Sequence, residues 1–155
     1  LSPKLNIDDN LYIYGINSGA NSDGHIGRQQ MNSILEKAQK IREKRIMIIA
    51  MHHSCLPIPK STYNRTVVDA GDALEKFAQN NISLVLSGFE HNSSVLQVKN
   101  TLYVNANTFS SKKIKSKIGN TFNLITRYEN SVIKVEEIEI ESGNKHFKGL
   151  FRVSI

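Results

Sequence analysis

The chain contains a single cysteine, Cys55, so it cannot form an internal disulfide. It therefore lacks the disulfide framework that is typical of small secreted scaffolds. Long apolar runs are also missing. The longest, such as residues 46–51, fall far short of the ~20 residues that a membrane helix needs, and no apolar segment opens the chain. We expect a soluble protein with a cytoplasmic location and no membrane partner.

Acidic residues are fewer than basic ones, 14 against 20, which gives a formal net charge of +6. Much of the excess lies in one cluster, Lys112, Lys113, Lys115 and Lys117, and no aromatic residue is interleaved there. Proteins that hold single-stranded nucleic acid stack the bases on aromatic side chains. Nucleic acid is therefore not the expected partner, and we interpret the cluster as a solvated loop.

With 155 residues, 39% of them hydrophobic and 22% charged, the chain has the length and composition of one globular domain. Such a chain buries roughly two-thirds of its unfolded surface. The first residue is Leu1 and not methionine. We therefore expect either a processed chain or a piece of a longer one.

Helical and strand patterns alternate in the first half. A β-rich run at 11–16 is followed by a polar, glycine-containing loop at 17–27 and an amphipathic helix at 29–45. The continuous apolar run 46–50 is typical of a strand covered on both faces. A second helix at 68–79, expected to bury Ala70, Leu74, Phe77 and Ala78, leads to a strand at 82–86. This order predicts an α/β fold with parallel strands.

The pattern after Gly88 is all-β. Residues 94–98 and 102–106, with a turn at Lys99-Asn100, predict one hairpin, and residues 121–128 and 132–140 predict another. In the last of these strands the apolar positions change parity, which predicts a β-bulge near Glu136-Glu137. The expected architecture is a parallel βαβ portion followed by antiparallel hairpins.

Histidines follow two of the predicted parallel strands directly. "MIIAMHHS" places His52 and His53 after the first, and "LVLSGFEHNS" places Glu90 and His91 after the second. Open α/β sheets gather their ligand sites at the carboxyl ends of such strands. Imidazole nitrogens from separate strand ends are a usual way to bind zinc, manganese or iron. The spacing alone does not distinguish between two interpretations: these histidines form a shared metal site, or they are ordinary loop histidines.

Other candidate residues have simpler explanations. Cys55 beside His53 is a formal nucleophile and base, but neighbouring side chains of an extended segment point apart. Asp69 and Asp72, at the start of the second helix, are interpreted as first-turn acids that complement the helix dipole. His25 and His146 lie in polar loops and are expected at the surface.

Several short motifs occur in an order that resembles the second half of calcineurin-like metallophosphoesterases. They are "GHIGRQQ" at 24–30, "HHS" at 52–54, "GFEH" at 88–91 and "NANT" at 105–108. Members of that family have a G-x-x-G-x-x-Q helix start, a strand ending in H-H-P or H-x-P, a strand ending in G-H-x-H, and an N-A-x-T-like turn. The similarity runs from about residue 11 to 111, and residues 121–140 resemble the closing strands of that β-sandwich flanked by helices.

The resemblance implies a function and roles for individual residues. His52 would bind one metal of a two-metal site, His91 would bind the other, and His53 would lie in the outer shell. The cofactors would be two divalent ions (Mn, Zn or Fe), and the substrate would be a phosphomonoester or phosphodiester. In such a site the metal ions hold the phosphate and activate water for in-line attack.

Two departures from the family pattern shape the prediction. Phe89 occupies the place of the first histidine of G-H-x-H, so Glu90 is a candidate replacement ligand. The family's D-x-H, G-D-x-x-D and G-N-H motifs are absent. We therefore expect residues 1–155 to form the carboxyl-terminal portion of one such domain, inactive by itself, which either associates with the missing amino-terminal half or self-associates. The alternative is a degenerate, non-catalytic domain that acts as a binding or regulatory module.

Overall fold

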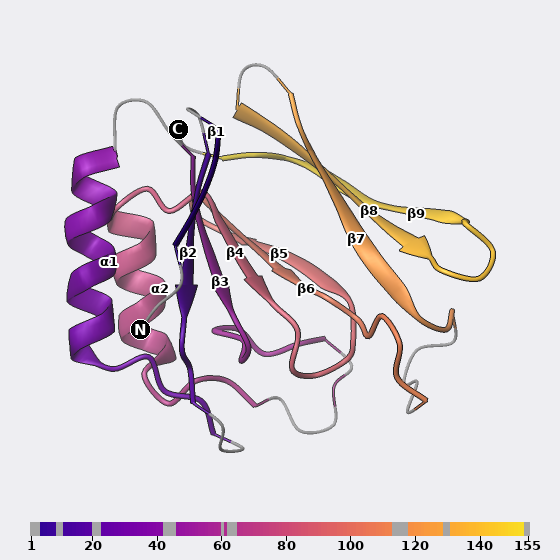
Figure 1. Ribbon diagram of the computed structural model, residues 1–155, viewed down its shortest axis with the longest axis horizontal. Helices are drawn as coiled ribbons and strands as arrows, with labels where there is room; N and C mark the ends of the chain where they lie inside the picture. Colours follow the sequence, from indigo (N-terminus) through magenta and orange to yellow (C-terminus); the bar gives the residue numbers. More distant parts are fainter. Residues whose placement is uncertain are drawn as a thin grey trace.

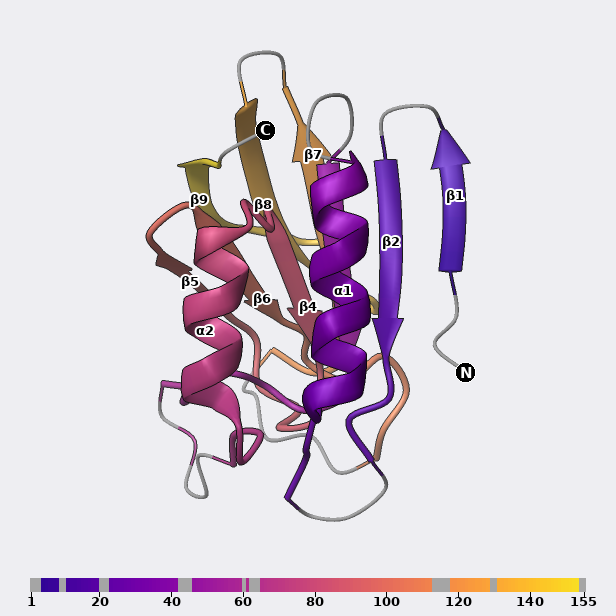
Figure 2. The same ribbon diagram turned by 90° about the vertical axis from the view of Figure 1, so that its left-hand side faces the viewer.

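The computed structural model describes residues 4–8, 11–19, 23–41, 46–59, 61, 65–112, 118–128 and 131–153. Its elements form three layers, with helices on one face of a large sheet and a small sheet on the other (Figures 1 and 2). In chain order they are β1 (Lys4–Asp8), β2 (Leu11–Ile16), α1 (Arg28–Ile41), β3 (Ile46–Met51), α2 (Ala70–Gln79), β4 (Leu84–Ser87), β5 (Ser94–Val98), β6 (Thr101–Asn105), β7 (Thr121–Arg127), β8 (Val132–Glu139) and β9 (Lys145–Arg152).

The large sheet has the strand order β1-β2-β3-β4-β6-β5, and the small sheet has the order β7-β8-β9. Strands β2, β3, β4 and β6 pair in parallel, whereas β1 and β5 pair antiparallel at the two edges of the large sheet. The small sheet is antiparallel throughout. The predicted α/β class, with a parallel portion followed by antiparallel hairpins, is confirmed.

Strand β3 shows why the large sheet needs a layer on each face. Its sequence, IMIIAM, is apolar without interruption. Ile49 belongs to the core that packs under the helices, and Ile48 belongs to the core that packs against the small sheet. Alternate side chains of a strand point to opposite faces, so a continuous apolar run is buried only where both faces are covered.

The two helices contact the large sheet through buried apolar stripes. Helix α1 buries Met31, Ile34 and Ala38 and ends at Ile41, while residues 42–45 of the predicted helix lie outside the described residues. Helix α2 begins at Ala70 and buries Ala73 and Phe77. The prediction missed Ala73 as a deeply buried position.

Both predicted hairpins are present, but two strands were missed. Strands β5 and β6 pair antiparallel, as do β7 and β8. Strands β1 and β9 carry charged residues and little apolar alternation, so the sequence pattern did not predict them. The expectation that His146 lies in a surface loop is wrong: it is half-buried within β9, and its Nε2 lies 2.6 Å from Oε1 of Glu139.

The bulge lies close to its predicted position, but its extra residue belongs to another strand. Strand β8 pairs with β7 without interruption. Against β9, the register shifts between Val135 and Glu136, because Val135 lies opposite Gly149 and Glu136 lies opposite Phe147. Lys148 is therefore the extra residue of a β-bulge in β9.

Within the described residues, no helix combines the length and the apolar character needed to cross a membrane. The helices instead contribute their apolar stripes to the core.

Cys55 is part of the core that packs under the helices and is 2% exposed. Its Sγ donates to Sδ of Met51 over 3.7 Å. Burial, with a smaller contribution from the charge of Asp69, raises the pKa of the Cys55 thiol to about 12. The thiol is therefore protonated at neutral pH, which argues against a nucleophilic role beside His53.

Replacing Phe77, which is fully buried, with alanine is expected to lower the free energy of unfolding by about 3–5 kcal/mol, because the substitution leaves a cavity. Phe147→Ala is the matched control: this ring is 62% exposed, so its loss should cost less than about 0.5 kcal/mol. Urea unfolding followed by circular dichroism measures both values. Equal losses would contradict the described core.

Cys55 is expected to resist alkylation by iodoacetamide at pH 8 in the folded protein and to react in urea. The folded thiol keeps its proton up to a pKa of about 12, whereas the exposed thiol loses it near 9.0. Between these values the folded state binds more protons than the unfolded state. The free energy of unfolding therefore falls as the pH rises from about 9 towards about 12. Equal alkylation rates in the native and unfolded protein would contradict burial.

Candidate functional site

The candidate site is formed where β3 and β4 end side by side. The two strands pair in parallel, with Ala50 opposite Leu86, so the segments that follow them leave the sheet at the same edge. The amides of Gly88 and Phe89 donate to the carbonyl of His52 over 3.2 and 3.0 Å. These bonds fix the turn after β4, which carries Glu90 and His91, against the residue that follows β3.

His52 is exposed at this edge. Burial of part of its ring, followed by the charges of His53 and then His91, lowers the pKa of His52 below its usual 6.5. His91 therefore lies near enough to His52 to contribute to this shift. A lowered pKa keeps the imidazole of His52 neutral at neutral pH, with a lone pair available for a metal or a proton.

His53 packs edge-on against His52, with ring centroids 4.9 Å apart, and is only 1% exposed. Its Nδ1 lies 2.9 Å from Oγ of Ser18, and its backbone amide donates to the same oxygen over 3.3 Å. Gly24 packs against the ring so closely that a Cβ at this position would lie 2.4 Å from Cγ of His53. Ser18 and Gly24, both in the loop after β2, thus hold His53 in place.

Phe89 fills the space beside the two histidines. Its ring centroid lies 4.6 Å from that of His53 and 5.0 Å from that of His52, the latter in an edge-on arrangement. Rings at these separations gain packing energy from their quadrupoles. Phe89 therefore stabilises the orientations of both imidazoles although it offers no lone pair.

Glu90 and His91 occupy a tight turn. Glu90 is 3% exposed, and its Oε2 accepts a hydrogen bond from Oγ of Ser61 over 2.7 Å. His91 has a φ of 50°, a left-handed conformation that is uncommon outside glycine and in which histidine is enriched. The roles of Glu90 as a metal ligand and of His53 as an outer-shell residue stay predictions.

The two imidazoles of His52 and His91 are the candidate metal donors at this edge. Among the residues that the structure describes, no three His, Cys, Asp or Glu side chains are grouped so that they could hold one ion. His52 and His91 are the candidate pair, and tight zinc sites use three or four protein ligands. The two imidazoles fit a divalent ion in chemistry, and further donors would have to come from outside the described residues.

Asn105, the last residue of β6, supports the turn after β4. Asn105 accepts a hydrogen bond from Oγ of Ser87 over 3.0 Å, and its Nδ2 donates to the carbonyl of Asn92 over 2.7 Å. It therefore connects the end of β6 to both sides of the turn that carries His91. The sequence motif at 105–108 marked this position without assigning it a role.

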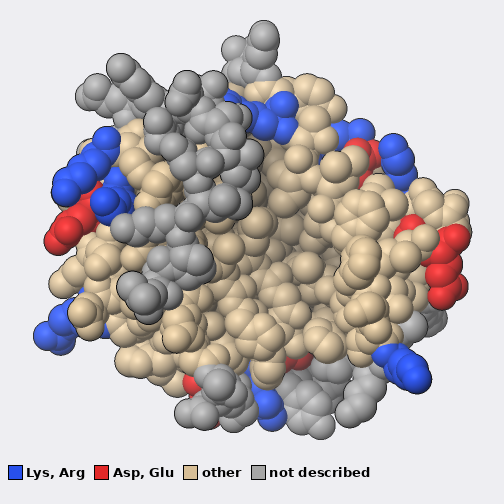
Figure 3. Space-filling view, viewed as in Figure 1, with Lys and Arg blue, Asp and Glu red and all other residues tan. Residues whose placement is uncertain are grey.

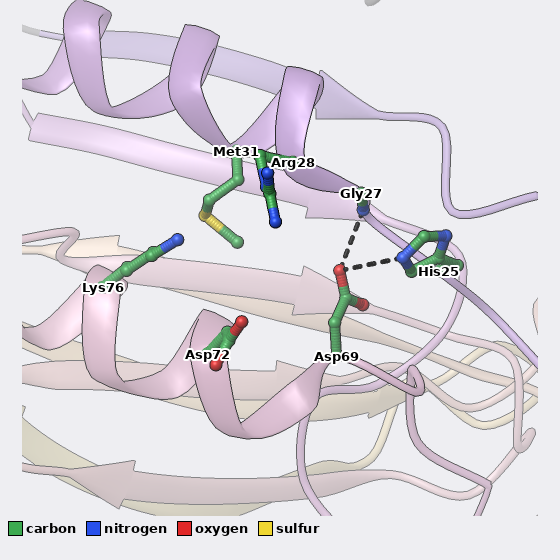
Figure 4. Close-up of a pocket in the computed structure, with 7 residues that line it drawn as sticks. All are labelled: His25, Gly27, Arg28, Met31, Asp69, Asp72 and Lys76. Carbon is green, nitrogen blue, oxygen red and sulfur yellow. Dashed lines mark hydrogen bonds and ion pairs between the residues drawn. The ribbon is translucent and has the colours of Figure 1, made fainter.

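A concavity lies between the two helices, and neither His52 nor His91 lines it (Figure 4). It has a volume of about 190 Å³ and is lined by His25, Gly27, Arg28, Met31, Asp69, Asp72 and Lys76. The carboxylate of Asp69 accepts hydrogen bonds from the amides of Ile26 and Gly27 over 3.0 and 2.8 Å. Asp69 lies directly before α2 in the chain, but its carboxylate binds backbone amides just before α1, which begins at Arg28.

His25 lies beside this carboxylate, with Nε2 at 3.5 Å from Oδ2 of Asp69, and its side chain is 63% exposed. Its predicted surface position is confirmed. The mixed charges and the structural use of Asp69 distinguish this cleft from the strand-end site.

Comparison with known proteins identifies the fold through structure alone. No family model matches the sequence, and no curated protein matches it. Among solved structures, the chain is similar to purple acid phosphatase PPD1 from yellow lupin (Lupinus luteus), with a TM-score of 0.66 and 13% identity over 99% of this chain. It is also similar to GAP50 of Plasmodium, with a TM-score of 0.60 and 14% identity, again over 99% of this chain.

The chain spans 32% of the lupin phosphatase chain and 54% of the GAP50 chain. At such low identity the likeness establishes the arrangement of helices and strands and nothing about activity. Over nearly its whole length, the chain therefore has a metallophosphoesterase-like fold.

Proposed function

We propose that this chain is the carboxyl-terminal portion of a metal-dependent phosphohydrolase, to which it contributes His52 and His91 as metal ligands. The substrate would be a phosphomonoester or a phosphodiester. The remaining ligands would come from the amino-terminal portion of the domain, so the chain alone would not turn over substrate.

One observation carries this proposal: His52 and His91 follow β3 and β4, whose carboxyl ends lie side by side, and His91 contributes to the lowered pKa of His52. Two imidazoles at such an edge would repel each other if both were charged, which favours their neutral forms. Neutral imidazoles are suitable ligands for a divalent cation. The fold shared with purple acid phosphatase supports the same conclusion.

Each residue would have a distinct part in this site. His52 and His91 would bind divalent ions, which supply Lewis acidity and an activated water when bound. His53, held by Ser18 and packed against Gly24, would keep the segment after β3 in place. Asn105 would do the same for the turn after β4 through its bonds to Ser87 and Asn92.

His52→Ala and His91→Ala are each expected to weaken Zn²⁺ or Mn²⁺ binding by about ten-fold or more, because each removes one of few ligands. Isothermal titration of the metal-free chain at pH 7.5 measures the affinities. His25→Ala is the matched control, since it removes an exposed histidine outside the site. Metal binding that is unaffected by the first two variants would refute the proposal.

Phe89 favours a second candidate function, a non-catalytic binding module. Its ring packs against both histidines where the family places a metal-binding histidine. The Plasmodium protein of the same fold is described as the anchor in the inner membrane complex. A module of this kind would retain the fold and the packing of His53 while losing the metal site.

Phe89→His separates the two functions. If the strand ends form part of a metal site, the added imidazole should strengthen metal binding by about ten-fold or more, because it supplies a further ligand. Phe89→Leu is the control, since it keeps an apolar side chain without a lone pair. Phe89→His with unchanged metal affinity would favour the binding module.

A further inference from the structure

The concavity between α1 and α2, called the helix cleft below, is lined by charged side chains that do not pair with one another. Arg28 of α1 and Asp72 and Lys76 of α2 all line it. Asp72 and Lys76 stand one turn apart on α2, a spacing at which opposite charges often pair. Within the part of the chain that the structure describes, none of these three side chains forms an ion pair or a hydrogen bond.

The same side chains reach into the helix cleft from both of its walls. Residues three or four positions apart share one face of a helix, so Arg28 and Met31 lie on one face of α1, and Asp72 and Lys76 lie on one face of α2. Figure 4 shows these four side chains directed at the space between the helices. Met31 is 3% exposed and gives the helix cleft an apolar wall.

Hydrogen bonds between the segments that precede the two helices fix the shape of the helix cleft. The carboxylate of Asp69, before α2, accepts from the amides of Ile26 and Gly27, before α1. The amide of Val68 donates to the carbonyl of Gly24 over 2.8 Å. The two walls are therefore held together without a ligand, and a preformed site loses less free energy to ordering when a ligand binds.

The balance of charge restricts the ligand. Arg28 and Lys76 carry positive charge, and Asp69 and Asp72 carry negative charge. An anion such as phosphate would meet two carboxylates, and a divalent cation would meet two cationic side chains; like charges brought together in this way oppose binding. Charged side chains of both signs also gather along the margin that the helices form, at the left of Figure 3. A ligand with one charge of each sign is therefore the best match.

The size of the helix cleft restricts the ligand further. Its volume of about 190 Å³ is below the roughly 300–1,000 Å³ of pockets that hold drug-sized molecules. A nucleotide is therefore too large. A small zwitterion, with an apolar part to cover Met31, fits both the volume and the lining.

We propose that the helix cleft binds a free α-amino acid with an apolar side chain. The carboxylate of the ligand binds Arg28 and Lys76, and guanidinium groups are well suited to carboxylates because they donate two parallel hydrogen bonds. The ammonium group binds Asp72, and the apolar side chain packs on Met31. His52 and His91 do not line the helix cleft, so this inference is independent of the proposed function.

L-Leucine is a suitable probe, and two analogues test each charge. Isocaproate has the same carbon skeleton without the ammonium group, and isoamylamine lacks the carboxylate. Binding is followed by NMR through the amide signals of Gly27 and Asp72, in EDTA, which removes metal ions that an amino acid could chelate. L-Leucine should shift these signals saturably, with a dissociation constant of about 1 mM or lower. Each analogue should bind about ten-fold more weakly or worse, because it leaves charges of the helix cleft without a partner.

Arg28→Gln and Asp72→Asn should each weaken L-leucine binding by about ten-fold or more. Lys40→Gln and Glu36→Gln are the matched controls. They remove the same charges from exposed positions of α1 outside the helix cleft, so binding should be unchanged. If a variant fails to fold, the comparison of the three ligands on the wild-type chain still decides the question.

Any of three results would overturn the proposal: no saturable shift with L-leucine, binding of either analogue as tight as that of L-leucine, or equal binding by the wild type, Arg28→Gln and Asp72→Asn. Tight binding of isocaproate would identify a simple anion site instead. Because the titration is made without metal ions, its failure leaves the metal test of His52 and His91 unaffected, and failure of that test leaves this one unaffected.

Discussion

The structure depends on the need to cover the parallel strands on both faces. Ile48 and Ile49, neighbours in β3, belong to two different cores, one against the small sheet and one under the helices. Each of these apolar side chains contributes roughly 1.5–3 kcal/mol when it is withdrawn from water. Neither the helices nor the small sheet alone can supply this burial, so the three layers form as a unit.

The candidate site forms where the extended backbone of β3 ends. Residues 52 and 53 lie in a bend, and their rings pack edge-on with centroids 4.9 Å apart. His52 is exposed, whereas His53 is buried and bonds to Ser18. The loop after β2 and the turn after β4 then pack around this pair, so that residues from three strand ends meet at one place.

Elements with strong local patterns were predicted well from the sequence. The apolar run of β3 and the alternation in the hairpins predicted these strands, whereas the shared role of His52 and His91 stays a prediction. Strand β9 was missed because its lysines and Gly149 suit a bulged edge, which weakens the apolar alternation. The contacts of His53 with Ser18 and Gly24 could not be predicted, since they join segments far apart in the chain and require no local motif.

The bulge and lysines of β9 have a consequence for assembly. A sheet with two receptive edges can add strands at both sides and grow without limit, as fibrils do. Here the bulge at Lys148 interrupts the register along β9, so this edge of the small sheet resists the addition of a further strand. The small sheet therefore has at least one edge at which fibril-like growth is blocked.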